Sequence, residues 1–406
     1  MAWAGPATSG RGLESLFTNR SIVEPDGAFS VGILSTYPSM QCSVATFAAS
    51  LADALVAGVP RMSVGVVRLR SGQPSSSEPQ NDAHELPPGV AAESREAARE
   101  LNKFDVVVMQ HEYGIHGDAD AEQLLDLLDW LRVPVVLVVR TVLSKPTAHQ
   151  RYVLEMLALS ADAVVTMSQS GHRALVDDYR VEPRRLMLIP HGAPAPDAVA
   201  RMAGRARRPM VLTWGLLAPG KGIEWGIDAL TAMSLLRPRP RYVVAGGTHP
   251  ELSAEEGDGY REFLAQRAID KGVAHLVEFE PTFVRPERLR QLLREADAVL
   301  LPYDSHEQAT SGVLIEALAA MVPVVSTRFP HAVELLGDGQ GGILVPQEDP
   351  AAIAAALTRI IVEPGVAAAM SAHNATFATV VSWPTVAGKY RLLFDAVTRR
   401  PPAPSG

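Results

Sequence analysis

Residues 302–325 read Pro302-Tyr-Asp-Ser-His-Glu-Gln-Ala-Thr-Ser-Gly-Val-Leu-Ile-Glu-Ala-Leu-Ala-Ala-Met-Val-Pro-Val-Val325. The apolar run before this stretch predicts a strand that ends at Tyr303, and the apolar spacing from Gly312 onward predicts a helix. A new strand begins at Val324, so the stretch forms the helical crossover of a βαβ unit in a parallel sheet. Because a helix N-terminus presents free N–H groups and a positive dipole end, we expect an anion to bind at Ser311 and Gly312.

The same alternation of short β-branched runs and longer helical patterns occurs in both halves of the chain and predicts an α/β fold with two doubly wound parallel sheets. We expect the strands of the first sheet at Ser30–Leu34, Arg61–Val67, Val106–Gln110, Val135–Val139, Ala163–Thr166 and Leu186–Ile189. We expect those of the second at Met210–Thr213, Arg241–Ala245, Val277–Phe279, Ala298–Leu301, Val324–Ser326 and Gly342–Leu344. Ligands of such folds bind at the carboxyl ends of the strands, here in two domains expected to face each other across a cleft.

The length of 406 residues also favours two domains, because it exceeds what one hydrophobic core usually supports. A stretch rich in Pro, Ala, Gly and Arg, without apolar periodicity, separates the halves and marks the domain boundary. The expected organisation is a flexible segment at 1–28, a first Rossmann-like domain at 29–196 with a polar loop at 71–92, a linker at 197–209, a second domain at 210–383 and a flexible tail at 401–406. An amphipathic pattern over 384–400 predicts a final helix that packs on the first domain.

The composition is that of a globular protein, and its charge balance argues against nucleic acid as the partner. A net charge of −8 argues against a protein whose affinity rests on neutralising nucleic-acid phosphates, although a small anionic ligand needs only a few local donors. Cys42 is the one cysteine, which excludes an intramolecular disulfide and fits the cytoplasm. We expect no secretion signal and no transmembrane segment, and we interpret the arginines of the linker as solvated in preference to weak peripheral membrane contact.

A glycine-rich loop follows the first predicted strand of the second half and reads Gly215-Leu-Leu-Ala-Pro-Gly220-Lys221-Gly222. It nearly matches the phosphate-binding loop of P-loop NTPases. In that loop, however, the lysine is followed by a serine or threonine that binds magnesium, and Gly222 stands there instead, which disfavours an ATPase. The glycines, Lys221 and a helix N-terminus still suit a diphosphate, with Lys221 as the main cation. The alternative is a glycine-rich connector with a solvated lysine.

With these two segments, the second half resembles the donor domain of glycosyltransferase family 4, a retaining family with the GT-B fold. The family has two glutamates separated by seven residues ahead of a Pro-Val-Val ending. Glu316 and Pro323 match this pattern, whereas Gln308 stands at the first glutamate position, where an amide can still contact sugar hydroxyls. Many members also have an arginine where this chain has Leu216, which leaves Lys221 to act alone.

The first half continues the resemblance. Its matching segments are Tyr37-Pro-Ser-Met-Gln-Cys42-Ser43-Val-Ala-Thr46-Phe47, Gln110-His111-Glu112-Tyr113-Gly114 and Ile189-Pro190-His191-Gly192. Ser43 replaces a glycine that contacts the donor phosphate in the family, so only a backbone contact is expected there. Arg140 stands where the family commonly has a histidine against the transferred sugar. It cannot act as a base, but it can bind sugar hydroxyls, a phosphate or an anionic acceptor.

The residues and the resemblance together assign roles. The donor nucleotide is expected to contact Ser43, Gly215, Gly220, Lys221, Gly247, Val284, Thr310, Ser311, Gly312, Val313 and Glu316. The residues expected to take part in transfer are Lys221, Gln308, Glu316 and Arg140. His111, Glu112 and Tyr113 are expected to contact the acceptor or the donor sugar, with a purely structural role as the alternative. His111 and His116 are five residues apart, not four as in a helical metalloprotease motif, so no metal is expected.

The resemblance implies an enzyme that transfers a hexosyl group from a nucleoside diphosphate sugar, UDP- or GDP-linked, to a hydroxyl group. The acceptor would be a sugar, a lipid or a small molecule, and transfer would proceed with retention and without a cofactor or metal. Lys221 and the helix N-terminus would stabilise the departing diphosphate. Two alternatives stay open: a GT-B phosphorylase or epimerase, and a nucleotide-sugar-binding protein whose catalytic site has degenerated at Ser43, Leu216, Arg140 and Gln308.

Overall fold

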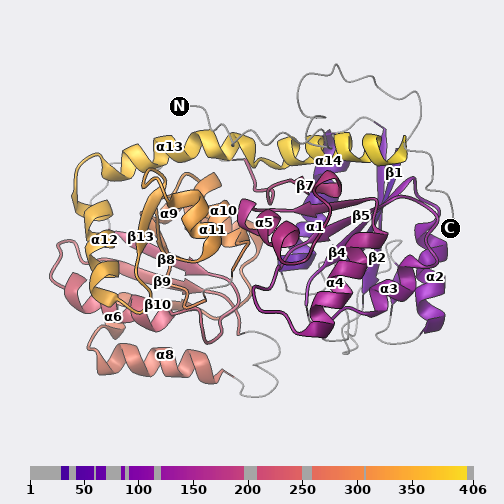
Figure 1. Ribbon diagram of the computed structural model, residues 1–406. Helices are drawn as coiled ribbons and strands as arrows, with labels where there is room; N and C mark the ends of the chain where they lie inside the picture. Colours follow the sequence, from indigo (N-terminus) through magenta and orange to yellow (C-terminus); the bar gives the residue numbers. More distant parts are fainter. Residues whose placement is uncertain are drawn as a thin grey trace. The chain divides into compact units, whose positions relative to one another are not determined.

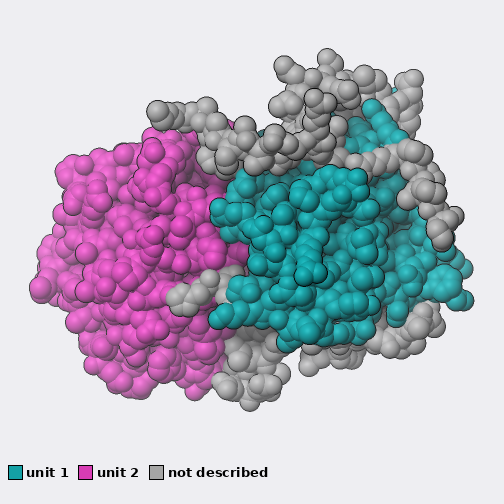
Figure 2. Space-filling view, in the orientation of Figure 1, with its two compact units in different colours: residues 1–190, 383–406 teal, residues 191–382 magenta. Residues whose placement is uncertain are grey.

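A computed structural model describes residues 29–35, 43–58, 61–69, 84–86, 91–113, 120–195, 208–248, 258–305 and 308–399. The chain divides into two compact units, one formed by Met1–Pro190 with Trp383–Gly406 and the other by His191–Ser382 (Figure 2). The segments expected to be flexible, 1–28 and 401–406, lie outside the described residues. Most of the expected loop 71–92 and of the expected linker 197–209 does so too.

The first unit contains a seven-stranded parallel sheet with the strand order β3-β2-β1-β4-β5-β6-β7. Figure 1 labels β1, β2, β4, β5 and β7 of this sheet. Its strands are β1 Phe29–Ser35, β2 Met62–Leu69, β3 His84–Leu86, β4 Val106–His111, β5 Val135–Val139, β6 Ala163–Thr166 and β7 Leu186–Leu188. Its helices are α1 Ser43–Gly58, α2 Ala91–Leu101, α3 Gln123–Leu128, α4 Ala148–Ser160, α5 Gln169–Asp177 and α14 Trp383–Thr398. All strands predicted for this half are present, and β3 is an additional edge strand.

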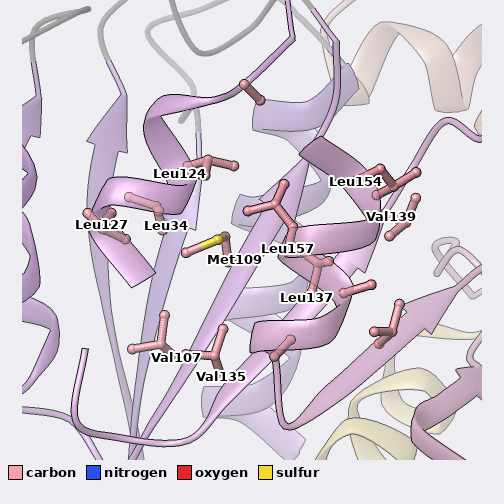
Figure 3. Packing of buried hydrophobic residues seen from close by; sticks show 14 of the residues in the cluster. Leu34, Val107, Met109, Leu124, Leu127, Val135, Leu137, Val139, Leu154 and Leu157 are labelled. Carbon is pink, nitrogen blue, oxygen red and sulfur yellow. The ribbon is translucent and has the colours of Figure 1, made fainter. Parts of the chain in front are cut away.

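Helices cover both faces of this first sheet, which is why its strands are almost continuously apolar. Val107 lies in a cluster with residues of α3 and α4 (Figure 3). Its neighbour Val106 lies in the opposite cluster, because successive strand residues point to opposite faces. That second cluster includes Phe47 of α1 together with Tyr390 and Phe394 of α14. The C-terminal helix therefore completes the core of the first unit.

The second unit contains a six-stranded parallel sheet with the order β10-β9-β8-β11-β12-β13. Its strands are β8 Met210–Trp214, β9 Arg241–Ala245, β10 Val277–Glu280, β11 Ala298–Leu301, β12 Val324–Thr327 and β13 Gly342–Val345. Its helices are α6 Ile223–Met233, α8 Gly259–Asp270, α9 Pro286–Glu295, α10 Gly312–Ala319, α11 Pro330–Leu336, α12 Pro350–Val362 and α13 Val366–Val380. All strands predicted for this half are present, which confirms the two doubly wound parallel sheets.

The strand order places one switch point in each sheet. In the second unit β8 and β11 are neighbours, but the chain leaves β8 toward β9 on one side and leaves β11 toward β12 on the other. The loops that follow β8 and β11 therefore separate at the carboxyl edge, where open α/β sheets bind ligands. In the first unit β1 and β4 form the equivalent pair.

Among the described residues no single helix has both the length and the apolar composition needed to cross a membrane. One pair, α12 and α13, meets that test only when the two helices are taken together, and they are bent by 91° relative to each other.

Candidate functional site

The glycine-rich loop after β8 packs directly against the loop that follows β11. The N–H group of Asp304 donates a hydrogen bond of 3.0 Å to the carbonyl oxygen of Gly220. A Cβ atom at Gly222 would lie only 1.9 Å from the carbonyl oxygen of Pro302, and the backbone of Gly222 has a φ of 61°. Only glycine fits this conformation at this distance. The two loops are thus held together by backbone contacts within the second unit.

The ends of β8 and β9 are in equally close contact. A Cβ atom at Gly246 would lie 1.8 Å from the carbonyl oxygen of Gly215, and the N–H of Leu217 donates to the carbonyl of Gly247 at 2.9 Å. A Cβ atom at Gly247 would lie 3.8 Å from the backbone nitrogen of Phe283, the residue before Val284. The structure therefore brings together Gly215, Gly247 and the segment that contains Val284, which the sequence predicts to contact the nucleotide.

At the N-terminus of α10, two backbone N–H groups have no hydrogen-bond acceptor among the described residues. The side chain of Ser311 caps the helix by accepting a hydrogen bond of 3.2 Å from the N–H of Leu314. The N–H of Ser311 itself donates to Nδ1 of His331 at 2.9 Å. The donors left at this end belong to Gly312 and Val313, the latter packed near Gly215 of the neighbouring loop. An anion bound here would be held by those two groups.

Lys221 supplies the positive charge of the same region. Its ammonium group lies 4.4 Å from the centre of the Tyr303 ring, and no carboxylate of the described residues pairs with it. Burial lowers the pKa of Lys221, since removal from water disfavours the charged form. An anionic ligand would supply the opposite charge that this lysine lacks.

Glu316 lies one turn inside α10 and is partly buried. Burial raises the pKa of its carboxyl group to about 7, and hydrogen bonding from the Trp214 side chain acts in the opposite direction. Such a carboxyl group is half protonated near neutral pH. Hydroxyl groups of a bound ligand, which donate to the ionised form, would shift it toward the carboxylate.

Gln308 and Thr310 form the turn that leads into α10. The amide of Gln308 donates to the carbonyl oxygen of Thr310 at 3.2 Å, and the carbonyl of Gln308 accepts from the N–H of His331 at 3.4 Å. In this structure the Gln308 side chain therefore stabilises the turn 308–311 through a hydrogen bond within that turn.

Two histidines belong to this region although the sequence does not predict them there. His331 accepts from Ser311, as described above. His191 is buried with its Nδ1 atom 2.7 Å from the carbonyl of Gly192, and its ring lies against Gly312, where a Cβ atom would be 3.1 Å from Nε2. His331 has no sequence signal of its own. His191 lies in the Ile189-Pro190-His191-Gly192 segment that carries the family resemblance, but nothing in that segment points to α10.

The first unit has a separate polar cluster at the carboxyl ends of β4 and β5. Glu112 accepts a hydrogen bond of 3.0 Å from the Thr141 hydroxyl and one of 3.1 Å from the N–H of Tyr113. The guanidinium group of Arg140 lies 4.0 Å from the Glu112 carboxylate and over the ring of Phe47, 5.1 Å from its centre. Burial raises the pKa of Glu112, and Arg140 opposes this rise. Glu112, Tyr113 and Arg140 thus lie together.

His111 is fully buried beside this cluster. Both of its ring nitrogens lack a hydrogen-bond partner among the described residues, and its ring meets that of Tyr113 edge-on at 4.9 Å. Burial lowers the pKa of His111 to about 4, so the ring is neutral at physiological pH. A buried ring without partners can offer a donor and an acceptor to a ligand hydroxyl. Ser43 is the exposed first residue of α1 in the same unit.

No group of three or more His, Cys, Asp or Glu side chains suited to a metal ion occurs in the part of the chain that the structure describes.

Residues 208–363 match the family model described as glycosyl transferases group 1. Similar sequences include a D-inositol 3-phosphate glycosyltransferase from Acidothermus cellulolyticus, 32% identical over 254 residues that cover 59% of this chain and 55% of the relative. A protein of the same name from Geodermatophilus obscurus is 31% identical over 221 residues, which cover 51% of this chain and 47% of the relative. The chain thus spans about half the length of these relatives.

Solved structures resemble the chain over most of its length. Sucrose-phosphate synthase from Thermosynechococcus elongatus matches with a TM-score of 0.71 and 19% identity, covering 91% of this chain and 100% of the other. HepE of Anabaena in complex with UDP-glucose matches with a TM-score of 0.69 and 16% identity, covering 90% of this chain and 99% of the other. The resemblance to glycosyltransferases expected from the sequence is confirmed, whereas assignment to family 4 stays a prediction. Residues 208–363, within the second unit, match the glycosyl transferases group 1 family, and the chain has the GT-B fold of two Rossmann-like units.

Proposed function

We propose that this protein is a glycosyltransferase that transfers a hexosyl group from a nucleoside diphosphate sugar to an acceptor hydroxyl, with retention at the anomeric carbon and without a metal ion. The supporting observation is the contact between two loops of the second unit. One loop contributes Lys221 without a carboxylate partner among the described residues, and the other leads to the unused N–H groups of Gly312 and Val313. This combination suits a diphosphate and would stabilise its charge as it leaves.

The same proposal covers the remaining donor contacts. Glu316 would accept hydrogen bonds from the ribose, and the Gly247 and Val284 segments would border the base. HepE, which shares the fold, is described with UDP-glucose, so UDP-glucose is the first donor to test, beside GDP-linked sugars. We place the reaction in the cytoplasm, which the single cysteine favours.

The acceptor site is proposed at the polar cluster of the first unit. Arg140 is nine-tenths buried there and brings a positive charge next to Glu112, while His111 offers ring nitrogens without partners among the described residues. Such a cluster suits a hydroxylated acceptor that also carries negative charge. The similar sequences are named D-inositol 3-phosphate glycosyltransferase. We therefore propose a phosphorylated polyol as the acceptor class.

A transfer assay tests this proposal. The purified protein is incubated with UDP- or GDP-linked glucose, mannose or N-acetylglucosamine and with inositol phosphates, and products are analysed by mass spectrometry and proton NMR with EDTA present. We expect a glycosylated acceptor, free nucleoside diphosphate and the anomeric configuration of the donor.

Other results would separate the alternatives. Donor binding without transfer to any acceptor would support the nucleotide-sugar-binding protein. Release of a sugar 1-phosphate from an oligosaccharide and inorganic phosphate would support a phosphorylase. Loss of transfer in EDTA would contradict a metal-independent reaction.

We expect the affinity for the donor to decrease as the pH falls below about 7. In the free protein the Glu316 carboxyl group takes up a proton through this range, whereas ribose hydroxyls bind the ionised form best. The dissociation constant should therefore rise by up to about tenfold per pH unit below 7 and level off above it. Calorimetry with a nucleotide sugar measures this, and Glu316→Gln, which cannot titrate, is the control. A wild-type affinity that stays constant from pH 5 to 8 would contradict the ribose contact.

A further inference from the structure

One residue of α11, His331, forms hydrogen bonds with both ends of the loop 308–311 that leads into α10. The backbone N–H of His331 donates to the carbonyl of Gln308 at 3.4 Å, and the ring Nδ1 of His331 accepts from the N–H of Ser311 at 2.9 Å. Between these points the Gln308 side chain bonds to the carbonyl of Thr310. The turn 308–311 is therefore fixed from outside α10, by a residue twenty positions further along the chain.

The buried, neutral ring of His331 is suited to accept the hydrogen bond from the N–H of Ser311. It is only 1% exposed, and burial lowers its pKa to about 4, so the ring is neutral. Because Nδ1 accepts from a backbone N–H, the proton of the neutral ring must be on Nε2. A buried backbone donor without an acceptor is destabilising, so Ser311, itself 1% exposed, depends on this ring.

The same corner of the second unit also supports Lys221. Phe329, two residues before His331, stacks on Tyr303 with ring centres 5.5 Å apart, and Lys221 lies over the Tyr303 ring. The hydroxyl of Thr327 donates to the Tyr303 carbonyl at 2.6 Å. The segment 327–331 thus holds both the aromatic ring under the lysine and the first turn of α10.

Resting on the function proposed above, we propose that His331 is a positioning residue of the donor site. The His331 ring accepts a hydrogen bond from the N–H of Ser311, so this N–H is not available to bind an anion. The same hydrogen bond fixes the first turn of α10. The N–H groups of Gly312 and Val313 alone are then presented to the donor diphosphate. His331 itself does not touch the donor.

Two substitutions at one position test this inference. His331→Leu removes the acceptor at similar size, whereas His331→Asn keeps an acceptor oxygen one bond beyond Cγ, where Nδ1 stands. We expect His331→Leu to bind UDP or GDP about tenfold more weakly than the wild type, and His331→Asn to restore most of the affinity. Affinity for uridine or guanosine, measured by NMR titration, should be unchanged in both variants, because nucleosides lack the diphosphate.

A general loss of structure would weaken nucleoside and nucleotide alike, and that result would overturn the inference. Equal UDP affinity in His331→Leu and wild type would also overturn it, while leaving the proposed function intact. Absence of UDP and GDP binding by the wild type would overturn the proposed function and this inference with it.

A second measurement needs no variant. In wild-type protein labelled with ¹⁵N at serine, glycine and valine, UDP or GDP should shift the amide signals of Gly312 and Val313 strongly and that of Ser311 weakly. A Ser311 shift as large as that of Gly312 would show that Ser311 binds the phosphate, and would overturn the inference.

Discussion

Replacing Gly222 with alanine is expected to lower the free energy of unfolding of the second unit by about 2–5 kcal/mol. The left-handed conformation alone, with φ at 61°, costs an alanine about 1–2 kcal/mol. The new Cβ would also lie 1.9 Å from the carbonyl oxygen of Pro302, so one of the two backbones must move, at a further cost of about 1–3 kcal/mol. Thermal unfolding should show a fall of about 4–20 °C in Tm.

Gly220 provides a matched control two residues earlier in the same loop. Its φ is 84°, but a Cβ atom there would meet no atom within 4 Å. Gly220→Ala should therefore cost only the conformational strain, about 1–2 kcal/mol. Equal Tm values for the two variants would contradict the close contact between Gly222 and Pro302.

This contact gives a physical reason for the departure of the loop from the P-loop pattern. A magnesium-binding serine or threonine would have to occupy the position of Gly222, where the neighbouring backbone leaves no space for any side chain. The sequence alone showed the missing hydroxyl but not its cause. The cause lies in the contact between β8 and β11 loops that are about 80 residues apart in the chain.

The parallel strands were predictable because each is a short apolar run buried on both faces. β3, His84–Leu86, was missed because three residues in a polar stretch have no period of their own. The loops that bear Lys221, Ser311 and Gly312 were predictable in the same way, since the carboxyl ends of parallel strands are where such folds bind ligands.

Individual contacts within the site could not be predicted. The local sequence predicts where α10 begins and that a serine caps it. Ser311 was therefore expected to donate its N–H to an anion. The acceptor that occupies this N–H, His331, comes from α11, and nothing in the local pattern points from one residue to the other. The same holds for His191 beside Gly312 and for Tyr303 under Lys221. Long-range pairing of single side chains requires the fold.

Replacing Lys221 with methionine is expected to weaken binding of the donor about 10- to 150-fold. Methionine keeps the length of the side chain and removes its charge, so the variant loses charge-assisted hydrogen bonds worth about 1.5–3 kcal/mol to the diphosphate. Calorimetry with the nucleotide sugar measures the loss. Lys221→Arg, which keeps the positive charge, should retain more affinity than the methionine variant.

Although Lys221→Met should weaken donor binding, it should not destabilise the protein without ligand. Burial disfavours the charge of Lys221, and no carboxylate of the described residues compensates for it. Tm without ligand should therefore stay the same or rise in Lys221→Met, while the rise in Tm caused by the donor becomes smaller. A lysine that mainly stabilised the loop would give the reverse, a lower Tm with donor affinity unchanged, and that result would remove Lys221 from the donor site.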